Sequence, residues 1–326
     1  MRLSRRDAIV FGSGLAAGSL GLWGLSRRGA AEPERHRVSR LAERASYGHG
    51  VAPPPEVGPL ALDRVTRPPA PTRPLEGRTR ALDLEVVDQR VAVAQERSLA
   101  AWTFGGSLPG PILRAALDDP LEITLRNRSG EAHNLHFHGS HDVAADGWEP
   151  VPPGGETVYR LSAGPIGVHP YHCDMTPDGD HIANGLYGAL IVDPPGGRPP
   201  AEEFVLVLGG FDTDGDGRSD VFGFNGMCGF YAKFPLKVAV GSLVRVYVVN
   251  MAVDQPMASF HLHAQTFDVY RTGTRLTPDD HTDVVMLGPT ERAILEFRLP
   301  DRGRYMFHPH QRHLAEGGAM GWFAAV

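Results

Sequence analysis

His133-Asn134-Leu135-His136-Phe137-His138-Gly139 places three histidines within six residues. Side chains alternate between the two faces of an extended strand, so His136 and His138 share one face while His133 projects from the other. A single histidine is more often a core or surface residue than a ligand. Three of them sorted onto two faces indicate ligands, and the segment predicts two neighbouring metal sites.

A second histidine-rich segment starts at residues 171–174, Tyr-His-Cys-Asp. By the same alternation, Cys173 faces one side of the chain, and His172 and Asp174 face the other. Two sites are again implied, and they are joined through the backbone of one residue.

One of these sites has a recognisable ligand set. Cys173, His133 and His181 supply one thiolate and two imidazoles, which is the ligand set of a trigonal blue (type 1) copper centre. Leu186 stands five residues after His181, where such sites often carry Met. An aliphatic side chain cannot donate to copper, so we expect a higher reduction potential than a Met-ligated site has.

The C-terminal half contains two further histidine pairs, His261-Leu262-His263 and His308-Pro309-His310. Each pair lies on one face of its strand. Pro309 removes the thiolate from the position between the last two histidines, so this half is expected to hold cluster ligands and no blue copper. The candidate partners of these pairs in the first half are His136, His138, His172 and Asp174.

Composition limits the other interpretations. The 326 residues, 42% of them hydrophobic, are enough for two ordinary domains with their own cores. The net charge of −6, with no Lys/Arg stretch interleaved with aromatics, argues against a nucleic-acid partner. Of the two cysteines, Cys173 lies among histidines, and Cys228 is expected to be a buried apolar residue rather than a disulfide partner.

Residues 1–30 resemble a twin-arginine export signal. Arg5-Arg6 precedes an uncharged run over residues 8–25, and Arg27-Arg28 closes it. The glycines in this run make it only weakly hydrophobic, which suits a signal better than a stable membrane span. We therefore expect an exported protein that is periplasmic, secreted or held at the cell surface, with no membrane span after export.

The rest of the chain divides into three parts. Residues 31–79 are rich in Pro and Arg and show no apolar periodicity, which predicts a linker. Short β-type runs separated by Gly/Pro turns follow, and they predict an all-β domain at 80–195 and another at 196–326. Because the two halves echo each other, we infer an internal duplication. The predicted strands include 82–86, 121–125, 158–161, 204–208, 243–249, 267–270, 293–297 and 322–323.

The segments HNLHFHG, YHCDM…HIANGLYGALIV, SFHLHAQTFDVYRTGT and YMFHPHQRHLAEGGAMGW resemble the two-domain multicopper oxidases. These are small laccase-like enzymes related to copper nitrite reductases, and the resemblance covers about residues 80 to 326. It implies two cupredoxin domains, which are Greek-key β-sandwiches or barrels, with type 1 copper in domain 1 only. It also implies a type 2/type 3 copper cluster between domain 1 of one subunit and domain 2 of the next, hence a homotrimer.

The resemblance further implies a reaction. Electrons from a small reducing substrate (a phenol, an aromatic amine or a metal ion) enter at the blue copper and pass through the Cys-His segment to the cluster. Dioxygen is reduced there to water. Related enzymes keep an acidic residue after the first histidine cluster, and Asp146 is the candidate for a general acid, with Asp142 as the lesser choice. A turn Asp before Gly explains Asp146 equally well.

One position departs from the family pattern. Multicopper oxidases carry His-Cys-His, whereas this chain has Asp174 after Cys173. A carboxylate is a harder copper ligand than imidazole, so Asp174 either completes an altered cluster or leaves one copper weakly held. Two alternatives therefore stay open: a copper-containing nitrite reductase, although those enzymes place Asp where this chain has His136, and a non-catalytic copper-binding or electron-transfer protein.

A calcium site is a lesser hypothesis. The loop at residues 212–220 matches the first nine positions of an EF-hand, but Gly223 occupies position twelve, where the bidentate Glu belongs. An ordinary Asp/Gly turn is the favoured interpretation.

Overall fold

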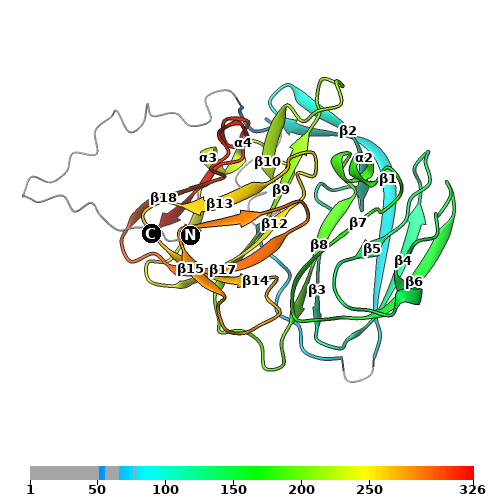
Figure 1. The fold of residues 1–326 in the computed structure, drawn as a ribbon, viewed down its shortest axis with the longest axis horizontal. Helices are drawn as coiled ribbons and strands as arrows, with labels where there is room; N and C mark the ends of the chain where they lie inside the picture. Colours follow the sequence, from blue (N-terminus) through cyan, green and yellow to red (C-terminus); the bar gives the residue numbers. More distant parts are fainter. Residues whose placement is uncertain (1–50, 56–65, 76–77) are drawn as a thin grey trace, which may run out of the picture. The chain divides into compact units, whose positions relative to one another are not determined.

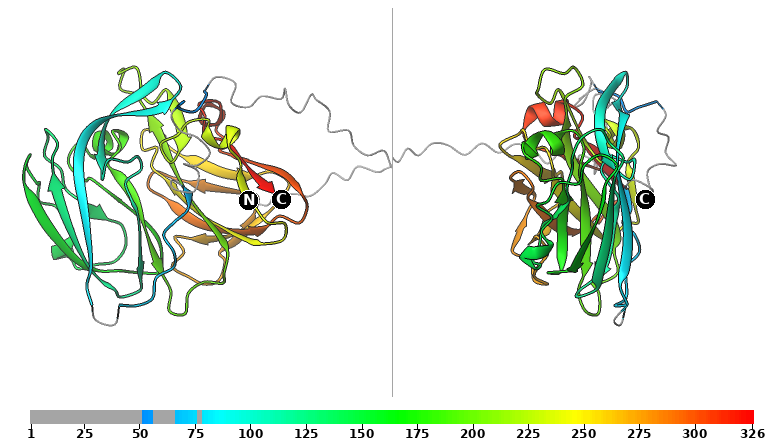
Figure 2. Two further views of the ribbon diagram at one scale, coloured as in Figure 1. Left: turned by 180° about the vertical axis from the view of Figure 1, so that it is seen from behind. Right: turned by 90° about the vertical axis from the view of Figure 1, so that its right-hand side faces the viewer.

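The chain folds into two β-sandwich domains, each made of two sheets (Figure 1). The computed structural model describes residues 51–55, 66–75 and 78–326, so the predicted export signal lies outside the described residues. Figure 2 shows the green strands of domain 1 on one side and the yellow-to-red strands of domain 2 on the other. The all-β, two-domain cupredoxin fold predicted from the sequence is confirmed.

Domain 1 contains two four-stranded sheets. The first has the order β2-β1-β4-β6, with β1 at Arg80–Ala94, β2 at Arg97–Phe104, β4 at Pro120–Asn127 and β6 at Glu156–Ser162. The second has the order β3-β8-β7-β5, with β3 at Ile112–Ala116, β5 at His136–Phe137, β7 at Gly167–His172 and β8 at Tyr187–Asp193.

Domain 2 contains a six-stranded and a five-stranded sheet. The larger has the order β10-β9-β12-β17-β14-β15, with β9 at Glu202–Phe211, β10 at Val221–Phe224, β12 at Leu243–Asn250, β14 at Phe267–Arg271, β15 at Asp280–Thr282 and β17 at Arg292–Arg298. The smaller has the order β11-β19-β18-β13-β16, with β11 at Leu236–Val238, β13 at Ala258–Leu262, β16 at Val284–Leu287, β18 at Gly303–His308 and β19 at Gly321–Ala325.

Helices are short connections between these strands. They are η1 at Val143–Ala145, α2 at Asp178–Ala183, α3 at Phe230–Lys233 and α4 at Arg312–Glu316. Helix α2 follows β7 and carries His181 in its last turn. In the part of the chain that the structure describes, no helix is both long and apolar enough to cross a membrane.

Strand pairing repeats from one domain to the other. Strand β1 runs parallel to β4 as β9 runs parallel to β12, and β3 with β8 matches β11 with β19. The short antiparallel pair β5–β7 places His136 opposite His172, and its counterpart β13–β18 places His261 opposite His308. This agreement supports the inferred duplication and puts the histidine pairs at equivalent places.

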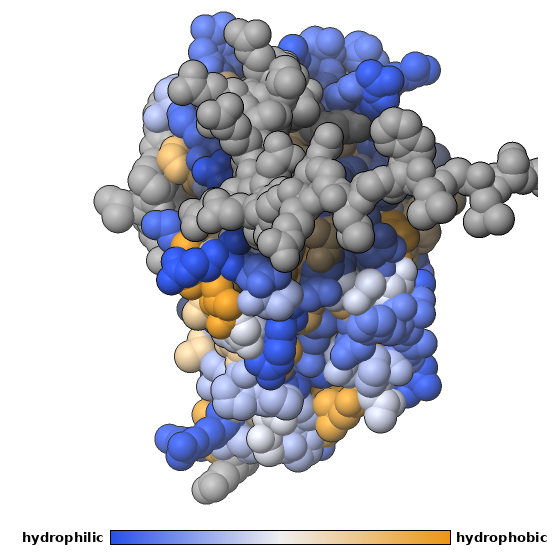
Figure 3. All heavy atoms as spheres, turned by 90° about the vertical axis from the view of Figure 1, so that its left-hand side faces the viewer, coloured by the Kyte–Doolittle hydropathy of each residue, from blue (hydrophilic) through white to orange (hydrophobic). Residues whose placement is uncertain are grey.

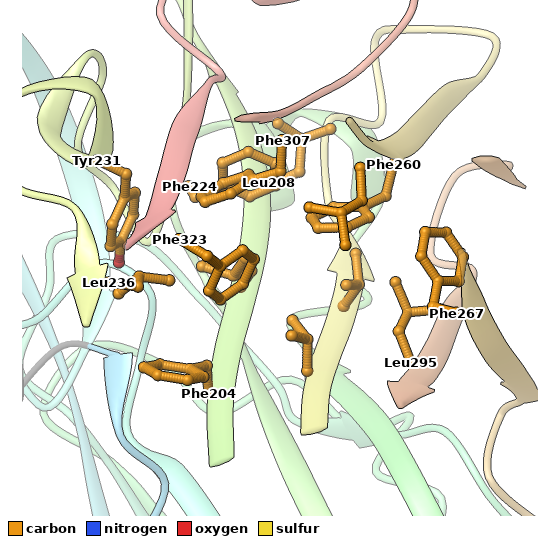
Figure 4. Packing of buried hydrophobic residues seen from close by; sticks show 14 of the residues in the cluster. Phe204, Leu208, Phe224, Tyr231, Leu236, Phe260, Phe267, Leu295, Phe307 and Phe323 are labelled. Atoms are coloured by element: carbon orange, nitrogen blue, oxygen red, sulfur yellow. The ribbon is translucent and has the colours of Figure 1, made fainter. Parts of the chain in front are cut away.

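Each domain has its own apolar core. In β4 of domain 1, Leu121, Ile123 and Leu125 are buried while the residues between them are not, which is the alternation expected of a strand with one covered face. The core of domain 2 combines aliphatic side chains with many phenylalanines, and Figure 4 shows Phe260 beside Phe307. On the face drawn in Figure 3, hydrophobic side chains form only small separate groups.

A third apolar cluster joins the two domains. Tyr187 and Ile191 of β8 pack in it with Val205 and Val207 of β9, and all four are essentially inaccessible. An interface built like a protein core holds the domains as one body, because opening it would expose large apolar surfaces to water.

A buried charge network crosses the same interface. Arg114 of β3 lies 2.7 Å from Asp193 and 2.7 Å from Glu203, and its side chain is 2% exposed. Glu203 also accepts from Arg245, which pairs with Glu296. Each charge in the network has a partner of opposite sign, which buried ions require.

The described parts of the predicted linker are attached to this body. Thr66 shares a hydrogen bond with the hydroxyl of Tyr231, and the backbone N–H of Thr72 donates to Asp193. The regular strands begin at Arg80, next to the predicted start of the first domain.

We predict that Arg114→Leu lowers the free energy of unfolding by about 3–5 kcal/mol, because it leaves the buried carboxylate of Asp193 without its cation and takes one of two arginines from Glu203. Denaturant unfolding of the purified protein measures this loss. Arg126→Leu is the matched control, since it breaks ion pairs with Asp83 and Glu156 on the exposed face of the strands. Equal effects of the two changes would contradict the assignment of Arg114 to a buried network.

Candidate metal centres

The first candidate centre is formed by Cys173, His133 and His181. Their Sγ and Nδ1 atoms converge: the distance is 3.1 Å between the two Nδ1 atoms, and Sγ lies 3.8 Å from that of His133 and 3.4 Å from that of His181. A small metal ion with bonds of about 2.0–2.3 Å holds its ligands roughly 3–4 Å apart, depending on the bond angles, so the three donors are close enough together to bind one ion. The structure brings together the three residues that the sequence predicted for a type 1 site.

Burial keeps both imidazoles and the thiol of this group in an environment that disfavours charge. His133 and Cys173 are fully inaccessible, and His181 is 9% exposed. Burial, with His181 nearby, lowers the pKa of His133 to about 4, and burial also raises the pKa of the Cys173 thiol. His133 is therefore neutral near pH 7, with a lone pair for a metal, whereas Cys173 ionises when a cation offsets the cost of its charge.

Two neighbours hold the cysteine. The backbone N–H of Asn134 donates to Cys173 Sγ at 3.5 Å, and the backbone N–H of Cys173 donates to the carbonyl of Leu186 at 3.0 Å. Leu186 is fully buried beside the group and belongs to the same apolar core. The sequence pointed to Leu186 by spacing, but it gave no sign of Asn134.

The second group lies on the opposite side of the same strand and consists of His136, His138 and His172. His138 Nε2 is 3.0 Å from His172 Nε2, and the ring of His136 lies 5.2 Å from each of the other two rings. His172 Nδ1 donates to the carbonyl of Cys173, which fixes the tautomer that carries its lone pair on Nε2. Burial followed by His172 lowers the pKa of His138 to about 3, so this imidazole is also neutral.

Domain 2 repeats this arrangement with His261, His263 and His308. His263 Nε2 is 2.9 Å from His308 Nε2, and His308 Nδ1 donates to the carbonyl of Pro309 as His172 does to that of Cys173. The three side chains line a surface pocket of about 480 Å³ together with His310. Both domains therefore present three converging imidazoles, and domain 2 has no cysteine next to them.

Asp174 and His310 occupy equivalent positions at the rim of these groups. Strand β7 ends at His172, and the backbone N–H of Asp174 donates to the side chain of Asn134. Among the described residues, the histidine group of domain 1 does not include the carboxylate of Asp174. The ring of His310 lies 4.6 Å from that of His261, but His310 is likewise outside the closest group of three. The ligand roles of both residues stay predictions.

Asp146 connects two histidines through one carboxylate oxygen. Its Oδ1 lies 2.7 Å from His136 Nδ1 and 3.0 Å from His141 Nε2. Burial opposes ionisation of Asp146, but hydrogen bonds from His141 and His136 outweigh it, so its pKa lies below the usual value. An ionised carboxylate that accepts from His136 orients this ring toward the group. The sequence gave His141 no partner, because a contact across a loop has no spacing rule.

The carboxylates of the acidic loop at residues 212–220 have hydrogen-bond and ion-pair partners within the protein. Carboxylates of Asp212, Asp214 and Asp220 come within 4.8 Å of one another, but Asp220 is paired with Arg97. Asp212 accepts the backbone N–H groups of Gly215 and Gly217. An ordinary Asp/Gly turn forms these bonds too, so the calcium site stays a prediction.

Comparison with known proteins places the chain in a family. One multicopper oxidase family model matches residues 85–197, and a second matches residues 199–326. The chain belongs to the multicopper oxidase family. Its matches include a copper-containing nitrite reductase from Neisseria gonorrhoeae, which is 30% identical over 324 residues, or 90% of this chain and 81% of that protein.

Solved structures agree with this assignment. The crystal structure of a multicopper oxidase shares 37% identity with a TM-score of 0.77, over 83% of this chain and 97% of that one. The copper nitrite reductase of Nitrosomonas europaea shares 29% identity with a TM-score of 0.68, over 76% of this chain and 94% of its own. This member of the multicopper oxidase family is thus a copper-dependent oxidoreductase.

We predict that the metal-free protein loses stability as the pH falls from about 6.5 to about 4. Burial lowers the pKa of His169 from 6.5 to about 4. Below pH 6.5, His169 therefore binds a proton in the unfolded chain but stays neutral in the folded chain. This difference lowers the free energy of unfolding by about 3 kcal/mol at pH 4. Above pH 6.5, His169 is neutral in both states, so it causes no loss of stability there.

Denaturant unfolding at a series of pH values, with a chelator present, measures this slope. His169→Gln should make it shallower, because Gln keeps a donor for the carbonyl of Pro165 and does not titrate. His281→Gln, at an exposed position, controls for the replacement of an imidazole by an amide. An unchanged slope in His169→Gln would contradict the prediction.

Proposed function

We propose that this multicopper oxidase takes electrons singly from a small reducing substrate (a phenol, an aromatic amine or a metal ion) and passes them to dioxygen, which becomes water. The observation that carries the proposal is the adjacency of His172 and Cys173. Cys173 belongs to a group with the donor set of type 1 copper, and His172 belongs to a separate group of imidazoles. One peptide unit therefore links an electron-accepting site to a second metal site.

The second metal site is proposed to form between subunits of a homotrimer. Each domain presents three converging imidazoles with the same hydrogen-bond pattern, and the pocket of domain 2 opens at the surface. A type 2/type 3 copper cluster needs more ligands than either group supplies. Bringing domain 1 of one subunit against domain 2 of the next supplies them, with Asp174 and His310 as the additional ligands.

Copper, when bound, supplies one-electron redox chemistry and a binding place for dioxygen. The residues supply the remainder. Cys173 would connect the two sites, Leu186 would offer no donor atom to the metal of the first, and Asp146 holds His136 in its orientation. Since the pKa of Asp146 is lowered, its proposed general-acid role requires it to receive a proton before it can deliver one.

We further propose export by the twin-arginine route, on the strength of residues 1–30. This route carries folded proteins, which suits a chain whose ligands come together only after folding.

Nitrite reduction is the second candidate, because curated relatives such as the Neisseria gonorrhoeae protein are named copper-containing nitrite reductases. If the protein is a nitrite reductase, a single copper held by three histidines would lie between subunits. Three converging imidazoles in each domain, with His136 at the position where reductases have Asp, favour the oxidase.

Copper counting combined with gas measurements separates these functions. The account expects about four coppers per chain, a blue absorption band and oxygen uptake with a phenolic donor. Nitric oxide formation from nitrite in the absence of oxygen, together with no oxygen uptake, would favour a nitrite reductase over an oxidase. A fully loaded protein inert toward dioxygen with every donor class would contradict the oxidase.

We predict that two inactive variants restore each other when they are assembled together. One subunit carries His138→Ala and His172→Ala, and the other carries His263→Ala and His308→Ala. A mixed trimer contains an intact domain 1 group facing an intact domain 2 group, so oxygen uptake should return to roughly a third of the wild-type value or less.

The control for this experiment is each double variant assembled alone, which should be inactive and still blue. Complementation would fail if the cluster formed within one chain. Size-exclusion chromatography with light scattering on the same samples reports whether the variants still assemble.

A further inference from the structure

Trp102 contacts both imidazoles of the type 1 group. The centre of its ring system lies 5.0 Å from the ring of His133 at an interplanar angle of 62°, and 4.8 Å from that of His181 at 39°. These are the tilted and edge-to-face arrangements that aromatic pairs prefer. Trp102 is neither a metal ligand nor a residue for which sequence patterns suggested a role.

The backbone of Trp102 is held rigidly. Trp102 lies in β2, where its register partner on β1 is Asp88, and its N–H donates to the carbonyl of Asn184 at 2.9 Å. Asn184 belongs to the connection between His181 and Leu186, so the bond ties β2 to the loop that carries part of the site. The indole is therefore placed by a strand and not by a free loop.

Burial decreases from the centre of the group toward Trp102. Cys173 and His133 are inaccessible and His181 is 9% exposed, whereas Trp102 is half-buried with part of its surface in solvent. A donor molecule cannot touch Cys173 or His133 directly. The indole of Trp102, which contacts both imidazoles, and the narrow exposed edge of His181 offer such a molecule contact with the group.

His133 also lacks the usual support of a metal-binding histidine. The second ring nitrogen of such a residue normally donates to a carbonyl, carboxylate or water, but Nε2 of His133 is buried with no hydrogen-bond partner among the described atoms. Ring packing must therefore orient His133. Trp102 is well suited to this, because indole has no acceptor or ligand atom that would compete for the metal.

We propose that Trp102 positions His133 and is the contact through which donor electrons reach the type 1 site; this rests on the proposed function. In each step the donor loses one electron and Cu(II) becomes Cu(I), and the indole has no net change. By excluding water, the indole also disfavours the more highly charged Cu(II) form, which raises the reduction potential of the site.

The test compares Trp102→Leu, Trp102→Phe and Trp322→Leu in the copper-loaded, oxidised protein without oxygen. Trp322 is the matched control, since it is a half-buried tryptophan on β19 of domain 2. Rapid mixing with hydroquinone follows the bleaching of the blue band. We expect Trp102→Leu to slow bleaching about tenfold or more, Trp102→Phe to slow it less, and Trp322→Leu to match the wild type.

A redox titration of the blue band supplies a readout independent of turnover. The potential should fall in Trp102→Leu and less in Trp102→Phe. Wild-type bleaching in Trp102→Leu, or a slower rate that its lower potential explains in full, would overturn the electron-contact role and favour entry at the edge of His181. An unchanged potential would overturn the exclusion of water by the indole, and an unchanged blue absorption band would overturn its positioning of His133.

The controls separate this inference from the function beneath it. A wild-type protein without a blue band contradicts the type 1 site itself. A blue wild type with oxygen uptake but no effect of Trp102→Leu contradicts only the role of Trp102. The blue absorbance per chain reports copper loading, and Trp102→Ile replaces the Leu variant if the latter does not load copper.

Discussion

The alternation of side chains along an extended backbone determines the arrangement of both metal groups. At the end of β7, His172 and Cys173 point to opposite sides, and each joins ligands delivered by other segments. Pairing of β5 with β7 brings His136 to one side, while the bridge between His133 and Val151 keeps His133 on the other. If this register slipped by one residue, the thiolate and the imidazole would exchange sites. The two-site organisation therefore depends on strand register.

Duplication of the domain explains why the second half has one group where the first has two. The pair β13–β18 repeats the geometry of β5–β7, including the bond from the ring nitrogen of His308 to the carbonyl that follows it. Pro309 replaces the cysteine, so the thiolate side of the strand has no ligand. The apolar cluster and the buried charges between the domains then fix the two groups relative to each other within a chain.

The sequence predicted the local features well because they follow from periodicity. The strand runs it marked lie in strands, and the three residues of the type 1 group come together as alternation requires. It could not predict contacts that depend on packing between distant segments. Trp102 reaches His133 only because β2 lies against the site, and His141 reaches Asp146 across a loop. Asp174 follows the end of β7, and its ligand role stays a prediction.

The most direct test of the account is the position of the metal. Diffraction data collected at the copper absorption edge from copper-loaded crystals give a map of anomalous scatterers in the assembled protein. The account predicts one strong peak bonded to Cys173, His133 and His181, and further peaks where the histidines of domain 1 meet those of domain 2 from a neighbouring subunit. A map with no peak at Cys173, or with the histidine groups of the two domains facing solvent in every assembly, would contradict it.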